Sequence, residues 1–155
     1  MAKDRRGFSF GLTPLLQQNE WRQFALLRQI ASINQSMSVL TKELAVFTAR
    51  LNQLDTEIST NLLQKKHIAI EQLEFLHQQK LSFQAIRLKK QTEMQEQRQQ
   101  HQKLLSDLSD LKKREEKILD VKEEALSEFD QAQAKQQLSQ LDEIYLQRRY
   151  QRSGL

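Results

Sequence analysis

Apolar residues from Leu26 to Ile58 follow a strict heptad spacing. The steps between them alternate between four and three residues, and the residues in between are mostly polar. This pattern predicts a coiled-coil helix whose narrow apolar stripe packs against one partner helix. The stripe consists of Leu26, Ile30, Ile33, Met37, Leu40, Leu44, Phe47, Leu51, Leu54 and Ile58.

A second stripe with the same spacing follows, but polar residues interrupt it. Its apolar members are Leu73, Leu76, Phe83, Met94, Leu104, Leu108, Leu111, Ile118, Ala125, Phe129 and Ala132. Its polar members are Lys80, Arg87, Lys90, Gln97, His101, Glu115 and Lys122. We therefore predict an all-α fold in which two long helices form an antiparallel coiled-coil hairpin and the second helix is longer.

Capping and turn residues set the expected boundaries. Residues 1–12 are predicted to be a flexible start, and Thr13 is predicted to cap a first helix over 13–58. Pro14 suits the first helical turn, because its missing N–H has no partner there.

The polar residues of Asp55–Asn61 favour a turn over 59–64 and a second helix over 65–150, within one coiled-coil domain spanning 1–155. A fold-back there sets Leu12 opposite residues 104–111.

This register leaves roughly the last 40 residues without an intramolecular partner. They still carry apolar residues, including Ile118, Phe129, Leu138 and Leu141. An isolated amphipathic helix is marginally stable in water, so we expect these residues to bind something. The sequence pattern favours a partner protein and a second copy of the chain equally.

Composition and charge narrow the function classes. The chain has no cysteine, no apolar run long enough to span a membrane and no apolar core in its first residues, so we expect a cytoplasmic protein. The net charge is +4, and residues 61–114 carry a net +5. A basic stretch can bind nucleic acid, but its basic clusters Lys65-Lys66 and Lys112-Lys113-Arg114 have no neighbouring aromatic residues for base stacking, so we expect no nucleic-acid partner.

No constellation of catalytic residues is present in the sequence. There is no Gly-rich phosphate loop, and the spacings of His67, His77 and His101 do not match a metal motif. The pairs Glu115-Glu116 and Glu123-Glu124 are expected to be solvated helix charges. We predict that the protein is not an enzyme and has no metal or cofactor.

Two motifs lie near the ends of the chain. One is the stretch from Phe8 to Leu16, with Pro14 in an apolar setting, and the other is a Leu-Asp-Glu run at Leu141-Asp142-Glu143 followed by arginines. Both resemble the FliJ family, the flagellar member of a group that includes the YscO-type proteins of injectisomes. Family members share about this length, a two-helix antiparallel coiled coil, an aromatic-Leu-Pro-Leu start and this closing run. The chain departs from the family at Ile144-Tyr145-Leu146, where smaller residues are usual.

The resemblance implies a non-enzymatic stalk of a type III protein export apparatus, flagellar rather than injectisome. The end that bears both termini is expected to enter the hexameric export ATPase and to promote ring assembly and ATP hydrolysis. The hairpin end is expected to reach the membrane export gate protein. Such a protein is peripheral at the inner membrane and monomeric alone, with export chaperones as possible further partners.

The expected contact residues follow from the resemblance. Those for the ATPase are Leu138, Leu141, Asp142, Glu143, Tyr145, Arg148 and Arg149. Those for the export gate are Ile70, Leu73, Phe75 and Leu76, although Leu73 and Leu76 equally suit the helix–helix interface. The alternative function is a generic coiled-coil scaffold or chaperone-like adaptor that dimerises through its C-terminal helix.

Overall fold

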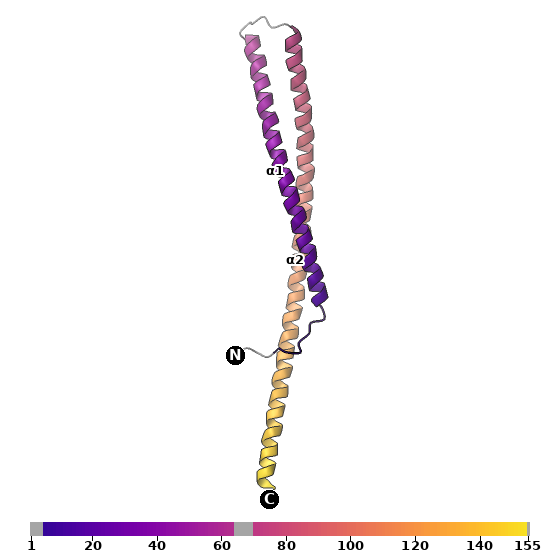
Figure 1. Ribbon diagram of the computed structural model, residues 1–155, viewed down its shortest axis with the longest axis vertical. Coiled ribbons are helices and arrows are strands. Elements are labelled where there is room, and N and C mark those ends of the chain that lie inside the picture. Colours follow the sequence, from indigo (N-terminus) through magenta and orange to yellow (C-terminus); the bar gives the residue numbers. More distant parts are fainter. Residues whose placement is uncertain (1–4, 64–69, 155) are drawn as a thin grey trace. The chain divides into compact units, whose positions relative to one another are not determined.

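The computed structural model describes residues 5–63 and 70–154, most of which lie in two α-helices (Figure 1). Helix α1 spans Thr13–Leu63 and helix α2 spans Ile70–Ser153. The predicted all-α fold with a longer second helix is therefore confirmed. Packing contacts divide the chain into two compact units. Unit 1 combines residues up to Gln23 with residues from Asp110 onward, and unit 2 is Phe24–Ser109.

In unit 2, the predicted α1 stripe is the side of the helix that is covered. Every one of its ten members is buried or half-buried, and Leu54 has no exposed surface. Leu51 and Leu40 are nearly as well buried, as is Met94 on α2. Leu burial of this kind contributes about 1.5–3 kcal/mol for each side chain relative to an exposed one. The a and d positions of the two helices are called the seam below.

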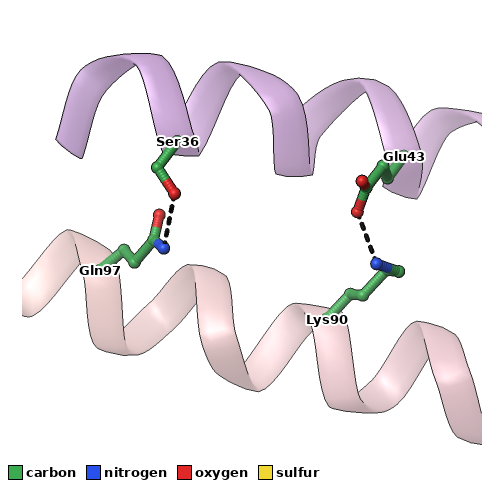
Figure 2. Close-up of polar contacts among 4 residues, drawn as sticks. All are labelled: Ser36, Glu43, Lys90 and Gln97. Atoms are coloured by element: carbon green, nitrogen blue, oxygen red, sulfur yellow. Dashed lines mark hydrogen bonds and ion pairs between the residues drawn. The ribbon is translucent and has the colours of Figure 1, made fainter. Parts of the chain in front are cut away.

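Polar residues of α2 occupy seam positions in unit 2 instead of leaving the seam. Lys80, Arg87, Lys90, Gln97 and His101 are all half-buried. Three of them meet polar residues of α1. Lys80 Nζ lies 2.5 Å from Asp55 Oδ1. Figure 2 shows the other two contacts: Lys90 Nζ lies 2.5 Å from Glu43 Oε2, and Gln97 Nε2 donates to Ser36 Oγ at 2.8 Å.

These contacts show that the two helices of unit 2 run antiparallel. Lys80 pairs with Asp55, Lys90 with Glu43 and Gln97 with Ser36, so residue numbers rise on one helix as they fall on the other.

Aromatic rings pack beside this polar group. The rings of Phe47 and Phe83 lie with centroids 5.7 Å apart, and Lys90 Nζ lies 5.8 Å from the Phe47 ring centroid. Lys90 therefore combines an ion pair with a cation–π contact, which together balance the cost of placing an ammonium group at a seam position.

The expected turn over 59–64 is wrong for its first five residues, since Ser59–Leu63 are helical. Gln64 and the expected start of the second helix over 65–69 lie outside the described residues. Helix α2 also continues to Ser153, past the expected end at Tyr150. The Ser, Thr and Asn residues near Ile58 favour caps locally, but Asn61 keeps the heptad spacing and is half-buried, so packing extends the helix.

Candidate protein-binding segment at the end of α2

Residues 5–12, here called the N-terminal strap, precede α1 in a non-helical conformation. A tight turn begins the strap, in which the Phe8 N–H donates to the Arg5 carbonyl at 3.1 Å. Gly7 has a φ of 85° in this turn, a left-handed conformation that glycine adopts without strain. Beyond the turn, the side chains of Phe8, Phe10 and Leu12 are half-buried.

The strap packs on α2 within unit 1. The Phe8 ring meets the Phe129 ring in an edge-to-face arrangement, with centroids 5.5 Å apart and an interplanar angle of 63°. Arg5 Nη2 lies 3.6 Å from Asp130 Oδ2, and the Asp130 side chain is only 13% exposed. An aromatic pair of this geometry contributes about 0.5–1.5 kcal/mol beyond the area it buries.

The junction of strap and helix differs from the expected cap. The Thr13 hydroxyl does not accept a hydrogen bond from the first turn, but donates to the Phe10 carbonyl at 2.8 Å. The Leu12 carbonyl accepts the first helical bond, from the Leu16 N–H at 3.0 Å, so the helix starts one residue earlier than a Thr13 cap requires. Thr13 thereby ties the strap to α1.

Polar residues also occupy the seam where α1 meets α2 in unit 1. Asn19 is 6% exposed, and its Nδ2 donates to the Leu111 carbonyl at 3.0 Å. Gln23 Nε2 donates both to Asn19 Oδ1 and to Glu115 Oε2. This network satisfies the buried Asn19 amide, whose burial without partners would cost about 1–3 kcal/mol.

These contacts correct the expected register. A fold-back near residue 61 sets Leu12 opposite residues 104–111, whereas in the structure Asn19 faces Leu111 and the strap reaches Phe129 and Asp130. The physical reason is that α1 continues to Leu63, which moves all pairings further along α2.

The uncovered part of α2 is consequently shorter than roughly 40 residues. Ile118, Ala125, Leu126 and Phe129 are half-buried, while every residue from 134 to 154 is exposed. We call residues 134–154 the uncovered segment. Ala132 was expected in the seam and is exposed.

All seven residues expected to contact the ATPase lie in the uncovered segment. Its apolar members are well exposed: Leu138 by 62%, Leu141 by 61% and Tyr145 by 66%. These three residues have the spacing of a single helix face. Asp142 and Glu143 lie more than a turn before Arg148 and Arg149, and no ion pair joins side chains within residues 134–154.

Further apolar residues surround this face. At about 100° per residue, Leu146 and Tyr150 lie roughly 130° around the helix from it, and Ile144 lies roughly 90° away on the other side. All three are exposed. The uncovered segment therefore presents apolar side chains on several sides, and a helix of this kind is normally enclosed by protein.

The residues expected to contact the export gate lie in the first turns of α2, within unit 2. Ile70 and Phe75 are 78% and 61% exposed, whereas Leu73 and Leu76 are half-buried at seam positions. Only Ile70 and Phe75 are therefore open to a partner in this structure.

Three exposed aromatic residues were missed by the sequence reasoning. Tyr150 is 80% exposed at the end of the uncovered segment, and Trp21 and Phe24 are 78% and 57% exposed on α1. All three are large apolar side chains outside the heptad stripe, and this position outside the stripe is the sequence signal that could have identified them.

Among the described residues, no group of three or more His, Cys, Asp or Glu side chains is arranged to hold a metal ion. Neither described helix has an apolar stretch that would cross a membrane. Comparison of the chain with protein family models, with curated proteins and with solved structures finds no match.

Proposed function

We propose that this protein is a non-enzymatic stalk of a type III protein export apparatus, of the FliJ type and more specifically flagellar. In this proposal, the uncovered segment enters the hexameric export ATPase and promotes ring assembly and ATP hydrolysis. The start of α2 faces the membrane export gate protein, which makes the protein peripheral at the inner membrane. The support is the resemblance of the two end motifs together with one structural observation.

That observation is the distribution of apolar residues around the uncovered segment. Leu138, Leu141 and Tyr145 form one face, and Leu146 and Tyr150 lie well away from it. A single partner helix covers only one narrow stripe of a coiled-coil helix. A ring that surrounds the segment covers all of these residues at once, so the stalk function is favoured over a scaffold that dimerises through this helix.

The charges of the uncovered segment suit the same proposal. Asp142 and Glu143 are exposed and without an ion pair, and so are Arg148 and Arg149. Exposed charges of both signs, separated along the helix, recruit residues of opposite sign on a partner and increase the rate of association.

At the other end of the proposed stalk, Phe75 is the residue with the clearest role. Its ring is exposed and lies off the seam, so the packing of α1 and α2 does not explain it. Exposed aromatic residues are enriched at protein interfaces. Leu73 and Leu76 contribute to the seam, and in our proposal they support the position of Phe75 rather than bind the gate protein themselves.

The decisive experiment is ATP hydrolysis by the cognate export ATPase, measured with and without this protein. Removal of residues 138–155 is expected to abolish stimulation, while circular dichroism continues to show a helical protein. Full stimulation by the truncated chain would refute insertion of the uncovered segment.

A matched pair of variants locates the contact. Leu141→Asp places a charge on the main apolar face, and we expect it to lose most of the stimulation. Leu88→Asp, at a leucine of α2 that lies in unit 2 and is 65% exposed, is the control for added charge and is expected to stimulate normally. Equal loss in both variants would indicate a general charge effect instead of a specific contact.

Sedimentation separates the stalk from the scaffold. A stalk is expected to be a monomer at all concentrations, whereas a scaffold that dimerises through α2 shows a concentration-dependent increase in mass. Because residues 134–154 are exposed, truncation would abolish any such dimer as well.

A further inference from the structure

We propose that the N-terminal strap is a releasable cover on α2, which competes with the partner of the uncovered segment for the α2 face at Ala125–Phe129. This inference rests on the proposed function, because it takes the partner to be the hexameric export ATPase. The strap and the ring then occupy neighbouring parts of one helix, and each limits the other.

The strap is built to detach more easily than either helix. Two of its backbone hydrogen bonds close tight turns, from the Phe8 N–H to the Arg5 carbonyl and from the Thr13 N–H to the Phe10 carbonyl, and a third joins its last residue to α1, from the Leu16 N–H to the Leu12 carbonyl. The side-chain contacts that attach it to α2 include the Phe8–Phe129 ring contact and an ion pair whose Arg5 side chain is 53% exposed. Segments with few backbone hydrogen bonds and shallow burial open at low free energy without unfolding the rest.

The surface at and beside the strap contact is of the same kind as the uncovered segment. Phe129, which the Phe8 ring contacts, is half-buried, as are the apolar residues Ala125 and Leu126 just before it, and the exposed residues from 134 onward follow along the same helix. Release of the strap would therefore lengthen the apolar surface that an enclosing partner can contact.

A ring that surrounds residues 134–154 approaches the strap directly. The strap anchors at Phe129 and Asp130 lie only about one helical turn before the uncovered segment. A ring that advances further along α2 has to displace them. Because coupling between two binding events is reciprocal, loosening the strap must then strengthen partner binding.

The sign of this effect distinguishes a cover from a structural clasp. If the strap only holds α2 in a binding-competent form, weakening it lowers the affinity for the ring. If the strap is a cover, weakening it raises the affinity.

The test measures the affinity of the full-length chain and its variants for the cognate export ATPase. Phe8→Ala removes the ring contact from the strap, and Asp130→Asn weakens the ion pair from the α2 side. Ser9→Ala is the matched control, since Ser9 is exposed on the same strap. A chain with a locked strap carries both Phe8→Cys and Phe129→Cys, and a short bismaleimide joins the two introduced thiols. The reaction is selective because the natural chain has no cysteine.

We expect Phe8→Ala and Asp130→Asn to bind at least about fivefold more tightly than the natural chain, the lower end of typical coupling, and the locked chain to bind more weakly by a similar factor. Ser9→Ala should bind like the natural chain. Equal affinities throughout, or weaker binding by both loosened variants, would overturn the cover while leaving the proposed function intact. A natural chain that does not bind the ring would instead refute the proposed function and this inference together.

Discussion

Replacing the polar seam residues of unit 2 with leucine is expected to leave stability nearly unchanged but to loosen the register of the two helices. In the double variant Lys90→Leu with Gln97→Leu, three successive seam positions of α2, at residues 90, 94 and 97, are apolar. The variant removes the two contacts to Glu43 and Ser36 that Figure 2 shows.

The opposing contributions to stability are similar in size. A leucine at each half-buried position contributes about 1 kcal/mol, roughly half the value for full burial. The lost Lys90–Glu43 pair, with side chains 24% and 41% exposed, stabilises by at most about 1 kcal/mol. The lost Gln97–Ser36 hydrogen bond contributes about 1 kcal/mol. The free energy of unfolding should therefore change by less than about 1 kcal/mol.

The register of the two helices is more sensitive than their stability. In the natural chain, a slide of one helix along the other by one heptad breaks both polar contacts, whereas the double leucine variant has no such contacts to lose. Such a slide also brings Lys90 level with Arg50 or with Ser36, depending on its direction. In the natural chain, these two contacts therefore favour the natural register by about 2 kcal/mol. In the double variant, the two leucines pack equally well in either register and favour neither.

Cysteine cross-linking tests this reasoning, because the chain has no cysteine of its own. In the natural background, Leu40→Cys should form a disulfide with Met94→Cys and not with Arg87→Cys or His101→Cys, which lie one heptad away. In the double leucine variant, the pairs one heptad away should also form. Exclusive cross-linking to position 94 in that variant would refute a role of the polar contacts in setting the register.

Three further outcomes follow from burial. Leu54→Ala should lower the free energy of unfolding by about 2–5 kcal/mol in urea denaturation, because Leu54 is fully buried, whereas Leu81→Ala, at a half-exposed site, should change it by less than about 0.5 kcal/mol. Truncation after Gln137 should shift the thermal midpoint by less than about 2 °C, since the removed residues cover nothing. Disruption of the Lys80–Asp55 pair by Lys80→Gln should cost less than about 1 kcal/mol, less still in 1 M salt, because Asp55 is half-exposed.

The sequence predicted the helices well because burial follows the heptad period. All ten residues of the Leu26–Ile58 stripe are covered, and so are the polar interruptions of α2 such as Lys90 and Gln97. The predicted register was wrong because it assumed a fold-back near residue 61, whereas α1 continues to Leu63. The cap signals near Ile58 were also overridden by packing, which continues the seam to Asn61.

The candidate site was only partly accessible from the sequence. The heptad pattern located an apolar stripe near the end of α2 but placed the start of its uncovered part too early, at Ile118. The non-helical strap has no repeating apolar pattern, so its packing on α2 could not be predicted in this way. The contact between Phe8 and Phe129 joins residues far apart in the chain, and no local pattern announces it. The additional apolar sides at Leu146 and Tyr150 were missed because a search for one stripe ignores residues outside it.

The length of the uncovered segment depends on the polar network of unit 1. Asn19 and Gln23 hold α1 in place through Leu111 and Glu115, and that placement brings Phe8 to Phe129. A slide of α1 by one heptad would set Phe8 opposite Lys122 or Gln136, neither of which offers a ring.

The double variant Asn19→Leu with Gln23→Leu should therefore release the strap from Phe129 without unfolding unit 1. The measurement is cross-linking of Phe8→Cys to Phe129→Cys by a short bismaleimide, which should become incomplete. Undiminished cross-linking would mean that the strap finds Phe129 by itself and that the polar network does not determine how much of α2 is left for a partner.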